Sequence, residues 1–277
     1  MATKIALIGA AGSMGTRAYN ALGADPNYEL SCVESPAGED RLREKGIDSV
    51  PLETAVKDAD VALMTVPDIL VGRVSTLVVP HLRPAGMLIV LDPAAPYAGE
   101  LPKRDDVTYF ATHPAHPPVF NDETDMAARR DYFGSGLAKQ AIVNALIQGP
   151  EEDYARGEAI GRRMFQPILR SHRVTLEQMA MLEPAMSETM AATCITVMRE
   201  AMDEAISRGV PAEAARDFMM GHINIELAIV FDEIDWEFSD GAKVAIEKAK
   251  GKVFQADWKK VFDRENLLES VRDIVKG

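Results

Sequence analysis

The chain has 277 residues, 43 of them acidic and 30 basic, so its formal net charge is -13. This acidity argues against a nucleic-acid-binding protein, because phosphate recognition needs clustered Lys and Arg. A hydrophobic fraction of 47% excludes a disordered chain, and no apolar run approaches the roughly 20 residues that span a bilayer. The length is near the limit at which one core divides into two domains.

The cysteine content and the N-terminus indicate a cellular compartment. Cys32 and Cys194 are too few for a disulfide framework or a multi-cysteine zinc site, which is typical of a reducing compartment. The apolar stretch that follows Met1 is too short for the core of a signal peptide. We therefore expect a soluble, cytoplasmic protein without nucleic-acid or membrane partners.

Short apolar runs alternate with helical patterns through the first half of the chain. We expect strands over residues 4–9, 28–34, 61–66, 87–92 and 107–112, a short edge strand at 49–52, and helices over 13–23 and 69–82. Runs this short and apolar are typical of strands that are buried on both faces. Their alternation with helices predicts an α/β fold with a Rossmann-like, doubly wound parallel sheet.

The second half is mainly helical. We expect late strands over 141–147 and 173–175, and helices over 151–169, 176–208 and 212–231, the long one closed by Gly209 and Pro211. This pattern predicts a Rossmann-like NAD-binding domain over residues 1–173. A helical domain for substrate binding and dimerisation follows over 174–277.

A glycine-rich turn directly follows the first predicted strand and opens the first helix. Its sequence GAAGSMG spaces Gly9, Gly12 and Gly15 three residues apart, one residue wider at the first step than the stricter dinucleotide motif. Glycines at such a turn let backbone N–H groups approach a pyrophosphate at the helix N-terminus. We therefore predict cofactor contacts from this turn, at Gly9, Ala11, Gly12, Ser13 and Met14.

Two acidic residues extend the predicted cofactor site. Glu34 ends the second strand, where a carboxylate accepts hydrogen bonds from both ribose hydroxyls and repels a 2′-phosphate. Glu34 favours NAD over NADP, although Arg41 and Arg43 lie nearby in the sequence. Asp68 follows the third strand, where ligands gather in open α/β sheets, but it is equally suited to cap the helix that follows.

The loop after the fifth strand carries two histidines. His113 and His116 are three residues apart among prolines that stiffen the chain, and the loop lies at the ligand-binding edge of the sheet. Imidazole serves as acid, base or metal ligand near neutral pH. The alternative for each is a hydrogen-bonded surface histidine without a catalytic role.

Glu183 is the candidate on the long helix. At 100° per residue, Met179, Leu182, Met186, Met190 and Val197 form one apolar stripe, and Glu183 lies at its margin while Glu188 lies opposite. A carboxylate at an apolar margin must be paired, protonated or bound to a ligand. Pro184 disturbs the local helix hydrogen bonds, a deviation common near sites. The alternative is a Glu at the helix rim that reaches solvent.

The next helix offers a further pair. His222 and Glu226 are spaced i, i+4, which suits a metal chelate or, more simply, an ion pair. The many methionines between 179 and 220 suit a helix–helix interface. We therefore expect a homodimer.

Five segments together resemble the D-apionate oxidoisomerase family, which joins an NAD-binding domain to a domain like the C-terminal part of phosphogluconate dehydrogenase. They are IALIGAAGSMG ending at Gly15, TVPD at 65–68, YFATHPAHPPVFNDETDM at 109–126, QGPEEDY at 148–154 and LEPAMSETMAATC at 182–194. The resemblance spans nearly the whole chain, and it implies NAD-dependent oxidation of D-apionate coupled to rearrangement into 3-oxo-isoapionate.

The implied chemistry suggests roles for individual residues. Oxidation of the 2-hydroxyl beside a tertiary alcohol gives a ketone that undergoes an acyloin-type shift, which a divalent metal assists. We hypothesise that His113 and Glu183 are catalytic metal ligands across the domain cleft, with zinc favoured and His116, Glu188, His222 and Glu226 in reserve. Without metal, His113 is the general base. Arg129, Arg130 and Lys139 are candidates for binding the substrate carboxylate.

Two other functions fit the same pattern. The first is a plain NAD(P)-dependent hydroxyacid dehydrogenase or imine reductase that performs no rearrangement. The second is a nucleotide sensor, which binds the cofactor without turnover.

Overall fold

The computed structural model describes residues 1–276, and its contacts divide the chain into two compact units. The first unit comprises Met1–Pro184 together with the chain from Leu268 onward, and the second comprises Ala185–Leu267. The expected boundary at residue 173 falls inside the first unit. The C-terminal segment also returns to the first unit, which a single boundary along the sequence does not describe.

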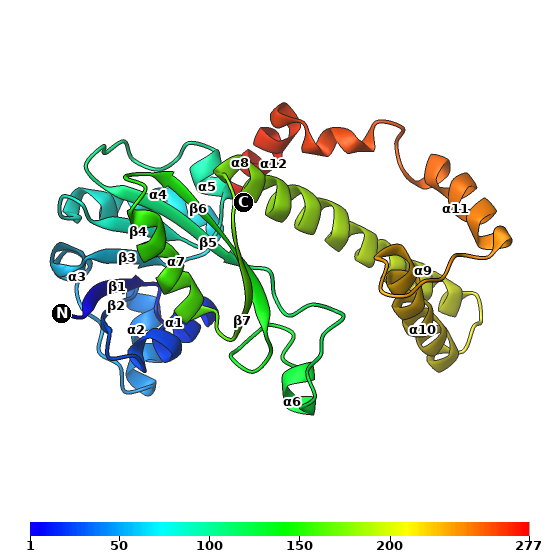
Figure 1. The fold of residues 1–277 in the computed structure, drawn as a ribbon, viewed down its shortest axis with the longest axis horizontal. Coiled ribbons are helices and arrows are strands. Elements are labelled where there is room, and N and C mark those ends of the chain that lie inside the picture. Colours follow the sequence, from blue (N-terminus) through cyan, green and yellow to red (C-terminus); the bar gives the residue numbers. More distant parts are fainter. Residues whose placement is uncertain (277) are drawn as a thin grey trace. The chain divides into compact units, whose positions relative to one another are not determined.

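The first unit contains one sheet and helices on both of its faces (Figure 1). The strands are β1 (Thr3–Ile8), β2 (Tyr28–Val33), β3 (Val61–Met64), β4 (Met87–Val90), β5 (Thr108–Pro114), β6 (Gln140–Gln148) and β7 (Ile168–Arg173). The helices are α1 (Ser13–Gly23), α2 (Pro36–Glu44), α3 (Leu52–Asp58), α4 (Asp68–Val78), η1 (Val79–His81), α5 (Ala94–Tyr97), α6 (Met126–Arg129), α7 (Asp153–Met164) and α8 (Leu176–Ala180).

The remaining helices follow α8. They are η2 (Met181–Ala192), α9 (Thr193–Ser207), α10 (Ala212–Val230), α11 (Asp240–Val253), η3 (Trp258–Phe262) and α12 (Arg264–Lys276). No helix within residues 1–276 is both long enough and apolar enough to cross a membrane. Both cysteines are free, and burial raises the pKa of the Cys32 thiol to about 11.

The strand order confirms the Rossmann-like fold. The sheet runs β2-β1-β3-β4-β5-β6-β7, and strands β1 to β5 are parallel to one another. The chain passes from β1 outward to β2, and then crosses back to place β3 on the other side of β1. Ligands of such sheets bind beyond the carboxyl ends of the strands at this reversal. Strand β6 departs from the parallel pattern, because it is antiparallel to β5.

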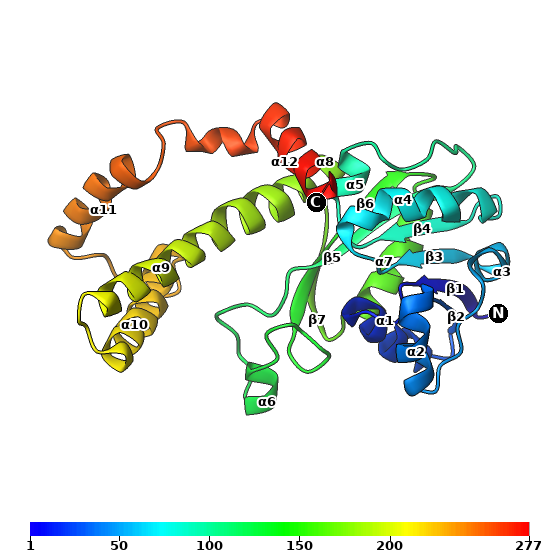
Figure 2. The same cartoon turned by 180° about the vertical axis from the view of Figure 1, so that it is seen from behind.

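The central strands are buried on both faces, as their apolar sequences predict. In β1, Ile5 and Leu7 join a core with α1, α2 and α7, whereas Ala6 and Ile8 join a core on the opposite face. Figure 1 shows α7 in front of the sheet, and Figure 2 shows α4 in front of the other face. The second core also includes Val271 from α12, which explains the return of the C-terminal segment.

Three expectations about the secondary structure were wrong. Residues 49–52 form no edge strand: Val50 donates one backbone hydrogen bond to Cys32 in β2 (2.7 Å), and α3 then begins at Leu52. Pro51 has no N–H group with which to extend a ladder. The helix expected over 151–169 ends at Met164, because Pro167 disfavours a helical conformation at the preceding residue. Strand β7 follows at Ile168, earlier than expected.

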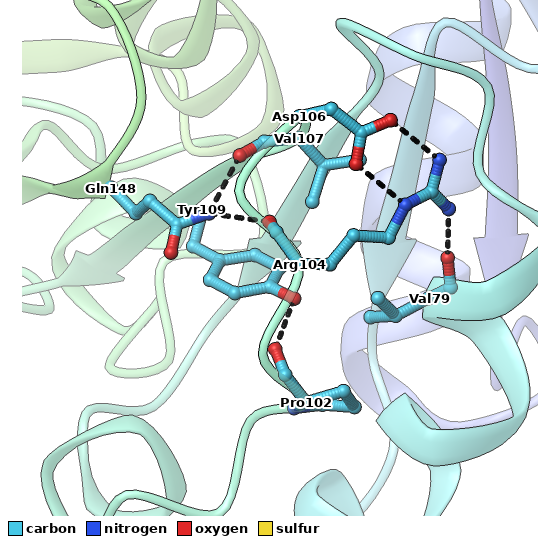
Figure 3. A network of polar contacts seen from close by, with 7 residues as sticks. All are labelled: Val79, Pro102, Arg104, Asp106, Val107, Tyr109 and Gln148. Atoms are coloured by element: carbon cyan, nitrogen blue, oxygen red, sulfur yellow. Dashed lines mark hydrogen bonds and ion pairs between the residues drawn. The ribbon is translucent and has the colours of Figure 1, made fainter.

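A network of hydrogen bonds and an ion pair stabilises the loop that precedes β5 (Figure 3). This loop leads into the amino end of β5, whereas ligands bind at the carboxyl ends of the strands. The Gln148 amide donates to the carbonyls of Arg104 and Val107, both at 2.8 Å. Arg104 pairs with Asp106 and donates to the Val79 carbonyl at 2.5 Å. One side chain at the end of β6 therefore satisfies two loop carbonyls.

We expect Gln148→Leu to lower the free energy of unfolding by about 1–3 kcal/mol, because it leaves two carbonyls of the loop without their donor. Urea denaturation monitored by circular dichroism measures this loss. Lys103→Met in the same loop is the matched control, because Lys103 is exposed. Equal stability of the two variants contradicts the assignment.

Candidate functional site

The glycine turn lies at the reversal of the strand order. Gly9 has φ +87°, and a Cβ atom there would lie 2.9 Å from the Thr65 carbonyl oxygen. A Cβ atom at Gly15 would lie 2.2 Å from the Gly9 carbonyl oxygen, so helix α1 packs directly on the turn. Thr65, just after β3, donates its hydroxyl to the carbonyls of Ile8 (2.8 Å) and Gly9 (3.1 Å). These contacts hold the turn at the carboxyl ends of β1 and β3.

Glu34 lies beside this turn, as the sequence predicts. Its Oε2 accepts a hydrogen bond from the backbone N–H of Ala11 at 2.8 Å, and its Oε1 accepts one from Ser35 N, also at 2.8 Å. A Cβ atom on Gly38 would collide with this side chain. The Glu34 carboxylate, just after β2, is therefore held against the glycine turn. A ribose bound beside the turn would contact this carboxylate.

Asp68 does not cap α4. The helix begins at Asp68 itself after Pro67, and no side-chain hydrogen bond caps it. Burial raises the pKa of the Asp68 carboxyl. The side chain instead lines a cavity at the carboxyl edge of the sheet.

That cavity has a volume of about 210 Å³ and brings together several predicted site residues. Its wall contains Met14 of the glycine turn, Asp68, His113, His116 and Glu183. The other lining residues are Thr65, Val66, Leu91, Asp92, Pro114 and Phe133. This volume is below the roughly 300–1,000 Å³ typical of pockets for drug-sized ligands, so it suits a small substrate.

His113 lies at the end of β5, and its ring orientation is set by a backbone carbonyl. Its Nδ1 is 2.7 Å from the Leu91 oxygen, just after β4. A carbonyl only accepts hydrogen bonds, so Nδ1 carries the proton and Nε2 is the free acceptor. Burial lowers the pKa of His113, and the Leu91 hydrogen bond opposes this only in part. A neutral imidazole with a free Nε2 suits a general base.

His116 is held in a similar way from the loop between β5 and β6. Its Nδ1 lies 3.1 Å from the Phe133 oxygen, and its ring centroid lies 6.5 Å from that of His113. The Phe133 oxygen also accepts from Arg17 Nη1 at 3.3 Å, and the Arg17 guanidinium lies over the Phe133 ring. Arg17 on α1 thereby connects the cofactor turn to this loop.

Glu183 lies in an unusual helical segment. Helix η2 is π-helical over Met181–Ala192 and contains Pro184, so the expected disturbance of the helix is confirmed. The angle of 100° per residue, however, does not apply across this segment, because a π-helix has a wider turn than an α-helix. Glu183 nevertheless lines the same cavity as His113 and belongs to the same unit, so the two do not face each other across two domains.

His222 and Glu226 of α10, the alternative metal ligands, do not line the cavity that contains His113. His222 and Glu226 line a separate cavity between α9 and α10 in the second unit. His222 Nδ1 contacts the Phe218 oxygen at 2.8 Å, and the two rings stack with centroids 3.9 Å apart. Glu188 also belongs to the second unit and lines neither cavity.

The 210 Å³ cavity is lined by side chains of the types that bind metal ions, three carboxylates and two imidazoles. Carboxylates and imidazoles are suitable ligand types for a divalent cation. Within residues 1–276, however, no three His, Cys, Asp or Glu side chains lie close enough together to hold one. This geometry does not support the hypothesised zinc site at His113 and Glu183.

Comparisons with known proteins identify the family of this chain. Residues 121–275 match the family model for the C-terminal domain of decarboxylating phosphogluconate dehydrogenase. The chain is 53% identical to a D-apionate oxidoisomerase from Cupriavidus necator, covering 99% of this chain and 100% of that protein. It is 50% identical to a D-apionate oxidoisomerase from Rhizobium rhizogenes, covering 98% and 99%. The chain belongs to the D-apionate oxidoisomerase family.

A solved structure extends the comparison to the fold. A Cupriavidus necator protein described as a semialdehyde dehydrogenase NAD-binding protein, in complex with calcium and NAD, is 52% identical to this chain. The match has a TM-score of 0.95 and covers 99% of this chain and 100% of that one. The resemblance noted in the sequence is therefore confirmed, together with the α/β fold.

Sequence reasoning missed Asp92 and Phe133, which line this cavity, and Arg17, which contacts Phe133. Asp92 ends the apolar run of β4, so the rule that selected Asp68 also applies to it; its Oδ1 accepts from Ala94 N at 2.7 Å. Phe133 and Arg17 meet only through contacts between distant segments. None of Arg129, Arg130 and Lys139, the candidates for the substrate carboxylate, lines the cavity.

Proposed function

We propose that this protein is an NAD-dependent oxidoisomerase that converts D-apionate into 3-oxo-isoapionate. One observation carries the mechanism: His113, with Nδ1 bound to the Leu91 carbonyl and Nε2 left as the ring acceptor, lines a small cavity that Met14 of the glycine turn also lines. The glycine turn and the candidate base therefore lie on one cavity at the carboxyl ends of the strands. Full-length relatives named D-apionate oxidoisomerase support this assignment.

The cofactor turn is suited to NAD. When bound, NAD accepts the hydride that leaves C2 of the substrate. The Glu34 carboxylate, placed at the end of β2, accepts hydrogen bonds from ribose hydroxyls and repels a 2′-phosphate, which favours NAD over NADP. At the start of α1, backbone N–H groups of the turn are placed to bind the pyrophosphate; the turn residues are Gly9, Ala11, Gly12, Ser13 and Met14.

His113 takes the proton of the 2-hydroxyl as the hydride leaves. Its half-buried, neutral ring is able to accept that proton near pH 7, because desolvation lowers its pKa from 6.5. The carboxylates of Asp68, Asp92 and Glu183 on the same cavity suit a substrate rich in hydroxyl groups, which donate hydrogen bonds to them. Glu183 is proposed to orient the substrate in this way.

Two experiments separate this function from its alternatives. Incubation with D-apionate and NAD, followed by identification of the products, distinguishes the oxidoisomerase from a plain dehydrogenase or imine reductase. Formation of NADH distinguishes an enzyme from a nucleotide sensor. Cofactor binding without NADH formation from any branched sugar acid would favour the sensor.

The metal hypothesis is tested separately. Because His113 Nε2 is able to accept the proton without a Lewis acid, we expect at least half of the NADH formation to survive exhaustive treatment with EDTA. Complete loss of activity, restored by zinc or calcium, would instead return His113 and Glu183 to the role of metal ligands.

We further propose that the enzyme is a homodimer that works in the cytoplasm. In the second unit, α9 and α11 bury no residue, and Ile195 on α9 is 64% exposed. Apolar helix faces of this kind are typical of surfaces that a partner covers. Sedimentation velocity should give twice the mass of 30.2 kDa. A monomer at micromolar concentration contradicts the dimer, and cell fractionation tests the location.

A further inference from the structure

The cavity contains a second imidazole that oxidation alone does not require. His116 and His113 both line it, with ring planes at 86° and centroids 6.5 Å apart. Oxidation of one hydroxyl removes one proton, for which one base is sufficient. A carbon migration that follows needs another base, because a second hydroxyl must lose its proton before the carbon skeleton rearranges.

The backbone at His116 lies in the left-handed region. Its φ is +59°, which is uncommon for residues other than glycine, although Asn, Asp and His adopt it more often than the rest. Non-glycine residues in this region persist where surrounding contacts enforce the conformation, and they are common at active sites. Here the contacts are the Phe133 carbonyl on Nδ1 and the Phe133 ring, whose centroid lies 5.7 Å from that of His116.

The Phe133 carbonyl is itself fixed from two sides. Arg17 on α1 donates to it, and Arg17 as a whole is only 8% exposed. The Asp131 carboxylate accepts the N–H groups of Ser135 (2.6 Å) and Leu137 (3.0 Å), which shapes the turn around Phe133. Because the Phe133 carbonyl accepts a hydrogen bond from Nδ1–H, the other ring nitrogen of His116, Nε2, is unprotonated and is able to accept a proton, as in His113.

We infer that His116 is the acid–base group of the carbon migration, whereas His113 serves the oxidation. This inference rests on the proposed function, and it assigns the two chemical steps to two imidazoles on one cavity. Arg17 and the Phe133 carbonyl are positioning groups for His116.

The steps balance in atoms and electrons. In the oxidation, His113 takes the proton of the C2 hydroxyl, and hydride passes from C2 to NAD, so C2 becomes a ketone. His116 then takes the proton of the C3 hydroxyl. As C3–O becomes a carbonyl, the bond from C3 to one hydroxymethyl carbon breaks, and that carbon moves with its electron pair to C2. The C2 oxygen takes back the proton held on His113. The products are 3-oxo-isoapionate, NADH and one proton, which His116 releases to solvent.

The test uses a variant that preserves the local structure. His116→Asn keeps a side-chain donor for the Phe133 carbonyl and tolerates positive φ, but it does not accept a proton. His172→Asn, an exposed position on β7, is the matched control. Calorimetric titration with NAD and circular dichroism should give wild-type values for both variants.

With D-apionate, we expect the migration rate of His116→Asn to fall by about 10²-fold or more, the usual contribution of an acid–base group. NADH should then appear together with the unrearranged 2-oxo-3-hydroxy acid, identified by carbon NMR after rapid quenching. Wild-type protein and His172→Asn should give the rearranged product. Rearranged product from His116→Asn in the wild-type ratio to NADH overturns the inference.

A second substrate keeps the test decisive if His116→Asn forms little NADH from D-apionate. A 2-hydroxy acid with hydrogen in place of the C3 hydroxyl can be oxidised but cannot rearrange. His116→Asn should oxidise it within about threefold of the wild-type rate. An equal loss on both substrates places His116 in the oxidation and refutes the assignment, whereas absence of NADH from wild-type protein refutes the proposed function instead.

Discussion

Replacing His113 with glutamine should lower kcat/KM for NADH formation by about 10²–10⁴-fold, the range that general-base catalysis contributes. Glutamine retains an amide N–H for the Leu91 carbonyl but has no group that accepts a proton near neutral pH. The ring of His113 is half-buried, and burial keeps its pKa below 6.5, so the wild-type base is neutral at pH 7. The loss should therefore appear across the neutral range.

Initial rates of NADH formation measure this effect, with His172→Gln as the control on β7. The affinity for NAD, measured by calorimetry, should stay within about twofold, because His113 is outside the glycine turn. Below its lowered pKa the wild-type His113 becomes protonated, so its rate should fall there while the residual rate of the variant does not. A variant that keeps a tenth or more of wild-type kcat/KM excludes His113 as the base.

The second large effect is expected at Gly15. A Cβ atom there would lie 2.2 Å from the Gly9 oxygen and 2.7 Å from Ala10 C and Cα, all of them backbone atoms of the turn. A backbone cannot rotate away as a side chain does, so Gly15→Ala must displace α1 or the turn. Overpacking of this kind costs about 1–3 kcal/mol of stability. We also expect the NAD affinity to fall at least tenfold, because the displaced N–H groups are the ones proposed to bind the pyrophosphate.

Gly12→Ala is the control for the steric part of this prediction. Its Cβ atom would meet the Gly9 oxygen at 3.5 Å, an ordinary contact, and Gly12 has an ordinary φ of -68°. Thermal denaturation should therefore show a clear loss for Gly15→Ala and little change for Gly12→Ala. Wild-type melting and NAD binding in Gly15→Ala would refute the packing of α1 on the turn.

The parts of the site predicted from the sequence are those that depend on one segment at a time. The run from Lys4 to Gly9 identifies a strand buried on both faces, and its end marks the ligand-binding edge of the sheet. The same reasoning led to Glu34 and His113, which the structure places at that edge. Asp92, which follows β4, lies at the same end of the sheet and lines the same cavity, so its position was equally predictable.

Other features depend on contacts that no local pattern records. The contact of Arg17 with Phe133 joins residues 116 positions apart, and the antiparallel β6 follows a long loop shaped by Asp131. The return of α12 depends on Val271 fitting the core beside α8. In η2, the wider turn of the π-helix changes which side chains share a face, so an analysis at 100° per residue failed there.

Carbon NMR of the products formed from D-apionate and NAD tests the proposed oxidoisomerase reaction directly. We expect one equivalent of 3-oxo-isoapionate for each NADH, with the migrated hydroxymethyl carbon attached to the original C2. An unrearranged 2-oxo acid as the sole product of the wild-type enzyme would refute the oxidoisomerase function, even if NADH forms at a high rate.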